Sequence, residues 1–225
     1  MKIGFIGAGV VGQTLAGKLA ANGHDVVIGI RKVNAEELAK NRNYAAPLGE
    51  WLKSNKAKVG TFSEAAAHGD IVFNVTSGEV SLDALKLAAA ENLKGKVLID
   101  VSNPLDFSQG FPPVLTPSLS GRTSVGEEIQ KAFPATHVVK AFNTLGAAHM
   151  IDKTLIKEPD DLFLSGNGES AKQAVRDLAA KEFGWKNFVD LGDITGARAQ
   201  EAIVLVWLRI FTQRGNADFN LHVAS

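Results

Sequence analysis

Three glycines near the start of the chain have the spacing of a phosphate-binding turn. Gly7, Gly9 and Gly12 form the pattern G-x-G-x-x-G directly after an apolar run at residues 3–6. The first glycine permits a tight bend, the second lets a pyrophosphate approach the backbone, and the third lets the next helix lie close to the strand, with its first amides facing the phosphates. The pattern predicts dinucleotide binding, and the alternative is an ordinary glycine-rich turn. The residues assigned to the pyrophosphate are Gly7, Ala8, Gly9, Val10, Val11 and Gly12.

A basic pair stands where many NAD-binding proteins carry a carboxylate. A predicted strand at 25–29 is followed by Ile30, Arg31 and Lys32. At this place, about 20 residues past the glycines, an Asp or Glu would bind the ribose hydroxyls of NAD and repel a 2′-phosphate. A guanidinium instead pairs with a phosphate through two hydrogen bonds, and a neighbouring ammonium adds charge. These three residues therefore favour NADP over NAD, with a solvated basic turn as the alternative.

Two more predicted strands, at 70–75 and 96–101, end in small polar turns. Open α/β sheets bind ligands at the carboxyl ends of their strands, so these turns are expected beside the cofactor. A plain helix-capping turn is the alternative for the first of them. The residues assigned to the cofactor site are Thr76, Ser77, Asn103 and Pro104.

The elements that position these turns alternate between strands and helices. Further strands are predicted at 58–61, 137–142, 162–165 and 188–191, with a last candidate at 218–223. A strand–helix alternation sustained to about residue 192 predicts an α/β fold of the Rossmann type, a doubly wound and mostly parallel sheet. We expect residues 1–192 to form the NADP-binding domain and residues 193–225 a small helical cap or dimerisation segment.

Hydroxyl residues indicate where several helices begin. Ser63 and Ser81 are expected to start helices, and Ser124 with Glu127 matches a capping box. The long loop at 105–123 is rich in Pro, Gly and Ser but also carries four large apolar side chains. We expect this loop to be a lid over a second substrate, with disorder as the alternative.

A helix predicted after Gly196 carries an apolar stripe. It could close over the cofactor cleft, pair with a second subunit, or belong to the core. The residues of the stripe are Ile203, Val206, Trp207, Ile210 and Phe211.

Composition narrows the possible partners and locations. The chain has 225 residues, with 24 basic and 24 acidic side chains and no cysteine. A balanced charge without basic and aromatic clusters argues against nucleic acid, and the absence of cysteine excludes disulfides and thiolate chemistry. The longest apolar run, 202–208, is far shorter than the roughly 20 residues of a membrane span. We expect a cytoplasmic protein that binds a small-molecule redox partner and no membrane.

The five histidines have no spacing that suggests a metal site or a catalytic triad. They are His24, His68, His137, His149 and His222. His149 could contact a second cofactor, and a merely polar helix position is the alternative. No residue is therefore assigned as catalytic, and no metal ligand is assigned.

The chain resembles the NADP oxidoreductases that depend on the deazaflavin coenzyme F420. The resemblance covers nearly the whole chain and includes I-G-x-G-x-x-G at the start, V-I-G-I-R-K at 27–32, D-I-V-F-N-V-T at 70–76 and V-V-K-A-F-N-T-L-G-A-A at 138–148. The NADPH domains of membrane ferric reductases look similar, especially at K-A-F-N-T. The resemblance implies NADP in the glycine cleft, a homodimer, and a second redox cofactor, a deazaflavin or a flavin. It also places Thr76, Asn103 and Ala141 along the nicotinamide side, and it assigns Phe142 and Asn143 to the cofactor site.

The chemistry that the resemblance implies is direct hydride transfer between stacked rings, which requires orientation rather than an acid–base pair. Two alternatives are an NADPH-dependent ferric or flavin reductase and a non-catalytic NADPH sensor. Hydroxyacid dehydrogenases share a similar first motif. They have a longer C-terminal domain and a catalytic lysine that has no counterpart between Gly196 and Gly215.

Overall fold

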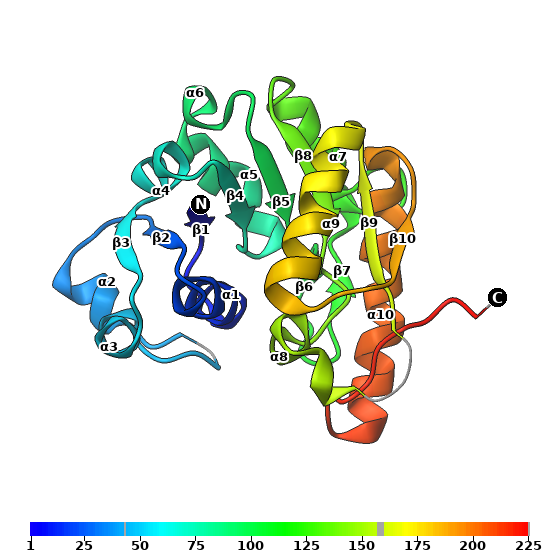
Figure 1. Ribbon diagram of the computed structural model, residues 1–225. Helices are drawn as coiled ribbons and strands as arrows, with labels where there is room; N and C mark the ends of the chain where they lie inside the picture. The colour runs from blue at the N-terminus through cyan, green and yellow to red at the C-terminus, as the bar shows by residue number, and fades with distance from the viewer. Residues whose placement is uncertain (43, 157–159, 225) are drawn as a thin grey trace.

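The computed structural model describes residues 1–42, 44–156 and 160–224 and contains one eight-stranded sheet (Figure 1). The strand order is β10-β9-β8-β5-β4-β1-β2-β3. The strands are β1 Lys2–Ile6, β2 Asp25–Ile30, β3 Lys58–Thr61, β4 Ile71–Asn74, β5 Val97–Asp100, β8 His137–Ala141, β9 Leu162–Gly166 and β10 Phe188–Asp190. This order confirms the Rossmann-type α/β fold that the alternating pattern predicts.

Helices cover both faces of the sheet. Alternate residues of each strand point to opposite sides, so Ile3 and Phe5 pack toward α1 and α9, whereas Ile6 and Val72 pack toward α4, α5 and α7. The helices are α1 Val10–Ala21, α2 Ala35–Ala39, α3 Leu48–Ser54, α4 Phe62–His68, α5 Gly78–Ala88, α6 Ala90–Leu93, α7 Val125–Ala132, α8 Ala147–Ile151, α9 Glu169–Phe183 and α10 Ala197–Arg214, with 3-10 turns η1 Pro117–Leu119, η2 Lys153–Leu155 and η3 Ile194–Gly196.

The last two strands of the sheet run against the others, as a mostly parallel sheet allows. β9 pairs with β8 in antiparallel fashion, and β10 then pairs with β9 in parallel. The described part of the link between β8 and β9 holds α8, with five residues, and η2. Because β9 is antiparallel to β8, the chain re-enters the sheet from the edge at which it left.

Three local expectations are wrong. The cap of α4 is Thr61, whose side chain and that of Glu64 form a reciprocal capping box, and Ser63 lies inside the helix. α5 begins at Gly78, and Ser81 lies in its first turns with a buried hydroxyl that donates to the Ser77 carbonyl oxygen. Residues 218–223 form no strand in the described chain. Their backbone is held partly by a carboxylate instead, since the amide of Val223 donates to Asp161.

Two other expectations are met at least in part. Ser124 caps α7, because its hydroxyl accepts from the amide of Glu127 at 3.1 Å. The carboxylate of Glu127 accepts from that hydroxyl at 2.8 Å rather than from the backbone amide of Ser124, so the predicted capping box is only half formed among the described residues. The loop at 105–123 is ordered around a small hairpin, β6 Leu105–Asp106 and β7 Val114–Leu115. Its function as a lid stays a prediction.

The C-terminal segment packs against the sheet as α10. This helix follows η3 and lies beside β9 and α7 (Figure 1). Its buried side is formed by Ala197, Gln200, Glu201, Val204 and Leu208. The predicted apolar stripe lies at the margin of that side, and Val206 is 50% exposed. The division of the chain at residue 192 stays a prediction.

In the residues that the structure describes, no helix is both long and apolar enough to cross a bilayer.

Gly4→Ala should strongly destabilise the protein. A Cβ at Gly4 would lie 2.1 Å from the carbonyl oxygen of Ala65, so β1 and α4 would have to separate. We expect a loss of about 3 kcal/mol in the free energy of unfolding, measured by urea denaturation. Gly9→Ala is the matched control, because an added Cβ there meets no heavy atom within 4 Å and should cost less than about 1 kcal/mol. Equal losses in the two variants would contradict this packing account.

Candidate functional site

The glycine turn between β1 and α1 leaves room for a ligand at its centre. Gly7 has φ +117° and an added Cβ would lie 3.1 Å from the backbone of Val75, so the fold itself requires this glycine. Gly9 is different, because an added Cβ there would meet no described heavy atom within 4 Å. Packing within the protein therefore does not require a glycine at this position. Gly9 is also the N-cap of α1, and no side chain caps that helix. The first amides of α1 are therefore free to receive an anion in the open space.

A basic cleft of about 280 Å³ lies on one side of this turn. Arg31 lines it as expected, whereas Lys32, also exposed, lies outside the lining. Two further cations line it, Lys40 and Arg42. The guanidinium of Arg42 donates to the backbone carbonyl of Glu37 at 2.9 Å, which holds it at the cleft wall. The sequence analysis missed Lys40 and Arg42, because only the folding back of the chain after α2 brings them to Arg31.

A second cleft of about 580 Å³ lies on the other side of the turn, at the carboxyl ends of β4 and β5. The structure brings together four of the predicted residues here, Val11, Thr76, Ser77 and Asn103. The remaining lining residues are Val75, Glu79, Val101, Ser102, Leu105, Asp106, Phe107 and Ser108. The two clefts lie on either side of the glycine turn and form an elongated site. Its smaller end is lined by three cations and one carboxylate, and its larger end carries the carboxylates of Glu79 and Asp106 among otherwise uncharged lining residues.

Four predicted residues stand behind this site rather than in its wall. Pro104 and Ala141 are buried outside both linings, as is Phe142, which adopts φ +64° and packs edge-on against Phe183 at 5.9 Å. Asn143 is 4% exposed. Direct contact of these four residues with a cofactor stays a prediction.

Asn143 instead fixes the position of Asn103. The side-chain amide of Asn103 donates to the backbone carbonyl of Asn143 at 2.8 Å, and the amide of Asn143 returns a hydrogen bond of 2.9 Å to the side-chain oxygen of Asn103. Asn143 also donates to the backbone of Gln200 in α10. The turn after β5 is thus held by the turn after β8, and both by α10.

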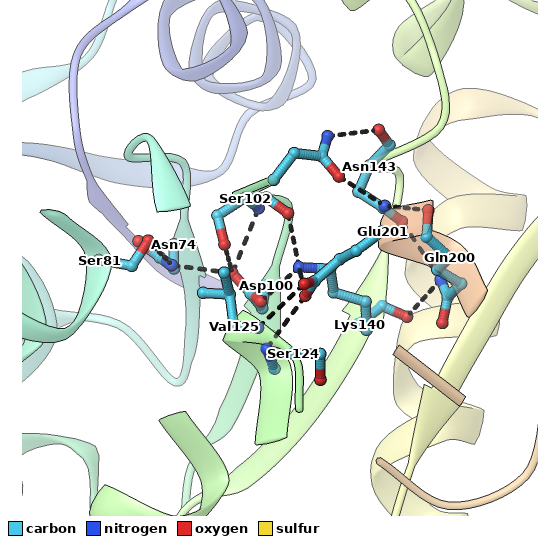
Figure 2. Close-up of polar contacts among 12 residues, drawn as sticks. Asn74, Ser81, Asp100, Ser102, Ser124, Val125, Lys140, Asn143, Gln200 and Glu201 are labelled. Atoms are coloured by element: carbon cyan, nitrogen blue, oxygen red, sulfur yellow. Dashed lines mark hydrogen bonds and ion pairs between the residues drawn. The ribbon is translucent and has the colours of Figure 1, made fainter. Parts of the chain in front are cut away.

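Beneath these turns lies a buried ionic cluster, formed by Lys140, Asp100 and Glu201 (Figure 2). The ammonium of Lys140 is fully buried and lies 2.8 Å from Asp100 and 2.7 Å from Glu201. It also donates to the backbone carbonyl of Ser102 at 2.5 Å. Burial alone would lower the pKa of Lys140, but the two carboxylates outweigh it and raise that pKa above its usual value. Burial likewise raises the pKa of Glu201, and Lys140 offsets this only in part.

Hydrogen bonds connect the ionic cluster to the wall of the larger cleft. One oxygen of Asp100 accepts from the hydroxyl of Ser102 at 2.7 Å and from the side-chain amide of Asn74 at 2.8 Å. The side-chain oxygen of Asn74 in turn accepts from the hydroxyl of Thr76 at 2.8 Å. Since Ser102 and Thr76 both line the cleft, the cluster stands directly behind its wall.

Glu201 and Gln200 anchor α10 at the same place. The carboxylate of Glu201 accepts from the amides of Val125 and Gly126 at the start of α7. The side chain of Gln200 accepts from Ser165 in β9 at 2.6 Å and donates to the backbone of β8. The sequence analysis missed both residues, because their partners are distant in sequence.

His149 is buried and makes no side-chain hydrogen bond to the described residues. It is 3% exposed, and neither ring nitrogen has a hydrogen-bond partner among the described residues. Burial lowers its pKa, although the carboxylate of Asp218 lies 3.7 Å away. The imidazole is therefore kept neutral near physiological pH. Contact with a second cofactor stays a prediction.

Known proteins resemble this chain in sequence and fold. The family of coenzyme F420-dependent NADP oxidoreductases matches residues 2–104. The F420-dependent NADP reductase of Methanothermobacter marburgensis is 30% identical, with 98% of each chain covered. A crystal structure of a candidate F420-dependent NADP-reductase from Arthrobacter sp. FB24 is 41% identical over the full length of both chains, with a TM-score of 0.92.

A second group of relatives is larger. The metalloreductase STEAP3 of Rattus norvegicus is 30% identical over 208 residues, which are 91% of this chain. The chain spans only 36% of the length of that protein.

Arg31→Ala should weaken NADPH binding by roughly 10- to 150-fold, since a charge-assisted pair with phosphate contributes about 1.5 to 3 kcal/mol. NADH has no 2′-phosphate, so its dissociation constant should change little. Lys32→Ala is the control and should lose less affinity, because Lys32 lies outside the basic cleft. Fluorescence titration of each nucleotide at fixed salt measures the effect. Equal losses for NADPH and NADH would show that Arg31 serves the fold or the adenine.

Proposed function

Since this chain belongs to the family of coenzyme F420-dependent NADP oxidoreductases, we propose that it transfers a hydride between NADPH and a deazaflavin of the F420 type. The observation that carries this proposal is the elongated site across the glycine turn, with a basic cleft at one end and a larger cleft without a cation in its lining at the other. The basic cleft would bind the 2′-phosphate of the dinucleotide, and the larger cleft would hold its nicotinamide together with a second planar ring.

The residues present fit NADP. The open space beside Gly9 and the uncapped start of α1 suit a pyrophosphate. Arg31, with Lys40 and Arg42, would supply the positive charge that a 2′-phosphate requires. The carboxylate of Glu37 also lines this cleft and pairs with Lys40 and Arg42, which leaves Arg31 as the cation that we propose for the phosphate. When bound, the nicotinamide supplies or receives the hydride at its C4 atom.

The larger cleft has room for an acceptor ring beside the nicotinamide. Its volume, about 580 Å³, lies in the range of roughly 300 to 1,000 Å³ that holds a small ligand. Thr76 and Asn103 form its inner wall, and Phe107, 56% exposed, stands on the outer wall in the loop at 105–123. We propose that the inner residues orient the two rings and that this loop excludes water, which is the contribution that hydride transfer requires.

A flavin that passes electrons to a metal chelate is the second candidate acceptor. The similarity to the metalloreductase STEAP3 covers 91% of this chain and favours it. The dinucleotide end of the site would be used in the same way, and only the ring in the larger cleft would differ.

Anaerobic oxidation of NADPH identifies the acceptor. Coenzyme F420, FMN, FAD, a ferric chelate and a small hydroxy acid are offered separately, and kcat/KM is measured for each. We expect the deazaflavin to give the highest value. Turnover of the hydroxy acid alone would refute the proposal, a preference for FMN or FAD would establish the second candidate, and tight NADPH binding without turnover would establish an NADPH sensor.

We also propose that two copies of the chain pair through the exposed side of α10. Val206 is 50% exposed on this helix, and Trp207 stacks on Phe211 at 5.5 Å to extend an apolar surface. Val206→Glu should give a folded monomer, because a charge is costly in an apolar interface. Light scattering and circular dichroism measure this. A wild-type mass near 23.9 kDa, that of one chain, would refute the dimer.

A further inference from the structure

The ionic cluster contains more negative than positive charge. Asp100 and Glu201 share a single ammonium, that of Lys140, so the three groups carry a formal charge of −1 when ionised. Asp100 and Lys140 are 0% exposed and Glu201 is 2% exposed. Water and salt therefore screen this charge far less than they screen a surface carboxylate.

The excess negative charge lies close behind the wall of the larger cleft, where it would interact electrostatically with a bound nicotinamide. Ser102 bonds to both Asp100 and Lys140 and also lines the larger cleft (Figure 2). Thr76 reaches Asp100 through Asn74 from the same wall. The cluster is thus connected to the cleft wall through one or two hydrogen bonds, and its three residues are not part of the cleft lining.

The two redox states of the cofactor differ in charge at the ring. Loss of a hydride, two electrons and one proton, to the acceptor ring turns the neutral dihydronicotinamide into a pyridinium cation. A buried negative charge behind the ring stabilises the cation and leaves the neutral ring almost unaffected. We propose that the ionic cluster sets the redox equilibrium of the bound nicotinamide by favouring NADP⁺ over NADPH. This inference rests on the proposed function, which puts the nicotinamide in the larger cleft.

The cluster is also built to keep this charge in place. Glu201 receives two backbone amides of α7 in addition to Lys140, and Asp100 receives Ser102 and Asn74. These hydrogen bonds offset part of the cost of burying the carboxylates. Burial raises the pKa of Glu201, and Lys140 offsets this in part, so the measurement is made at pH 8, where the higher pH favours the ionised carboxylate.

The test is the ratio of two dissociation constants, Kd of NADP⁺ over Kd of NADPH, in wild type, Glu201→Gln and Asp100→Asn. Each variant keeps the shape of the side chain and removes one negative charge. The ratio should rise by about 3- to 10-fold in each, the effect of one poorly screened charge several ångströms away. A purely structural disturbance would move both constants by the same factor. The two variants are independent, so either one that keeps the wild-type circular dichroism gives a result.

Ser124→Ala is the matched control. Ser124 caps α7 beside the amides that bind Glu201, and its loss disturbs the same helix end without changing charge. Its ratio should equal that of the wild type. An unchanged ratio in a folded charge variant, with both nucleotides still bound, would overturn the inference and leave the proposed function intact. A wild-type protein that binds neither nucleotide would overturn the proposed function, and this inference with it.

Discussion

The contact between Lys140 and its two carboxylates holds the site together. Asp100 comes from β5, Lys140 from β8 and Glu201 from α10, and Glu201 also closes the start of α7. A buried ammonium is tolerated only where carboxylates and carbonyls surround it. The same ammonium binds the carbonyl of Ser102 in the wall of the larger cleft. The geometry of that wall therefore depends on the pairing of Lys140 in β8 with Glu201 in α10.

The run K-A-F-N-T at 140–144 has a physical explanation in this cluster. Lys140 provides the cation, Phe142 turns the chain at φ +64° and packs into the core, and Asn143 binds Asn103 and Gln200. Each residue has a different task, and none of the three lines the cleft. This run therefore supports the wall of the cleft and does not itself select the ring that the cleft would hold.

Sequence reasoning was sufficient to locate the parts of the site that are formed by residues close together in the chain. The glycine turn and Arg31 follow from residue type and spacing alone, and the strands that carry them are short and strongly apolar. Sequence reasoning failed where a pairing is distant, as for Glu201 with Lys140, or where the chain folds back, as for Arg42 with Arg31. It also did not find the antiparallel direction of β9, because no residue type in the link between β8 and β9 marks the direction of the returning strand.

The position of β9 and α10 late in the chain has a consequence for the synthesis of the protein. Until residues 162–201 leave the ribosome, β8 is an open edge strand, and α7 lacks the carboxylate that binds its first amides. An unpaired edge of this kind is a template for pairing with other chains. The nascent protein thus carries the strands around the glycine turn before β9 covers the edge of β8 and before α10 brings Glu201 to the start of α7.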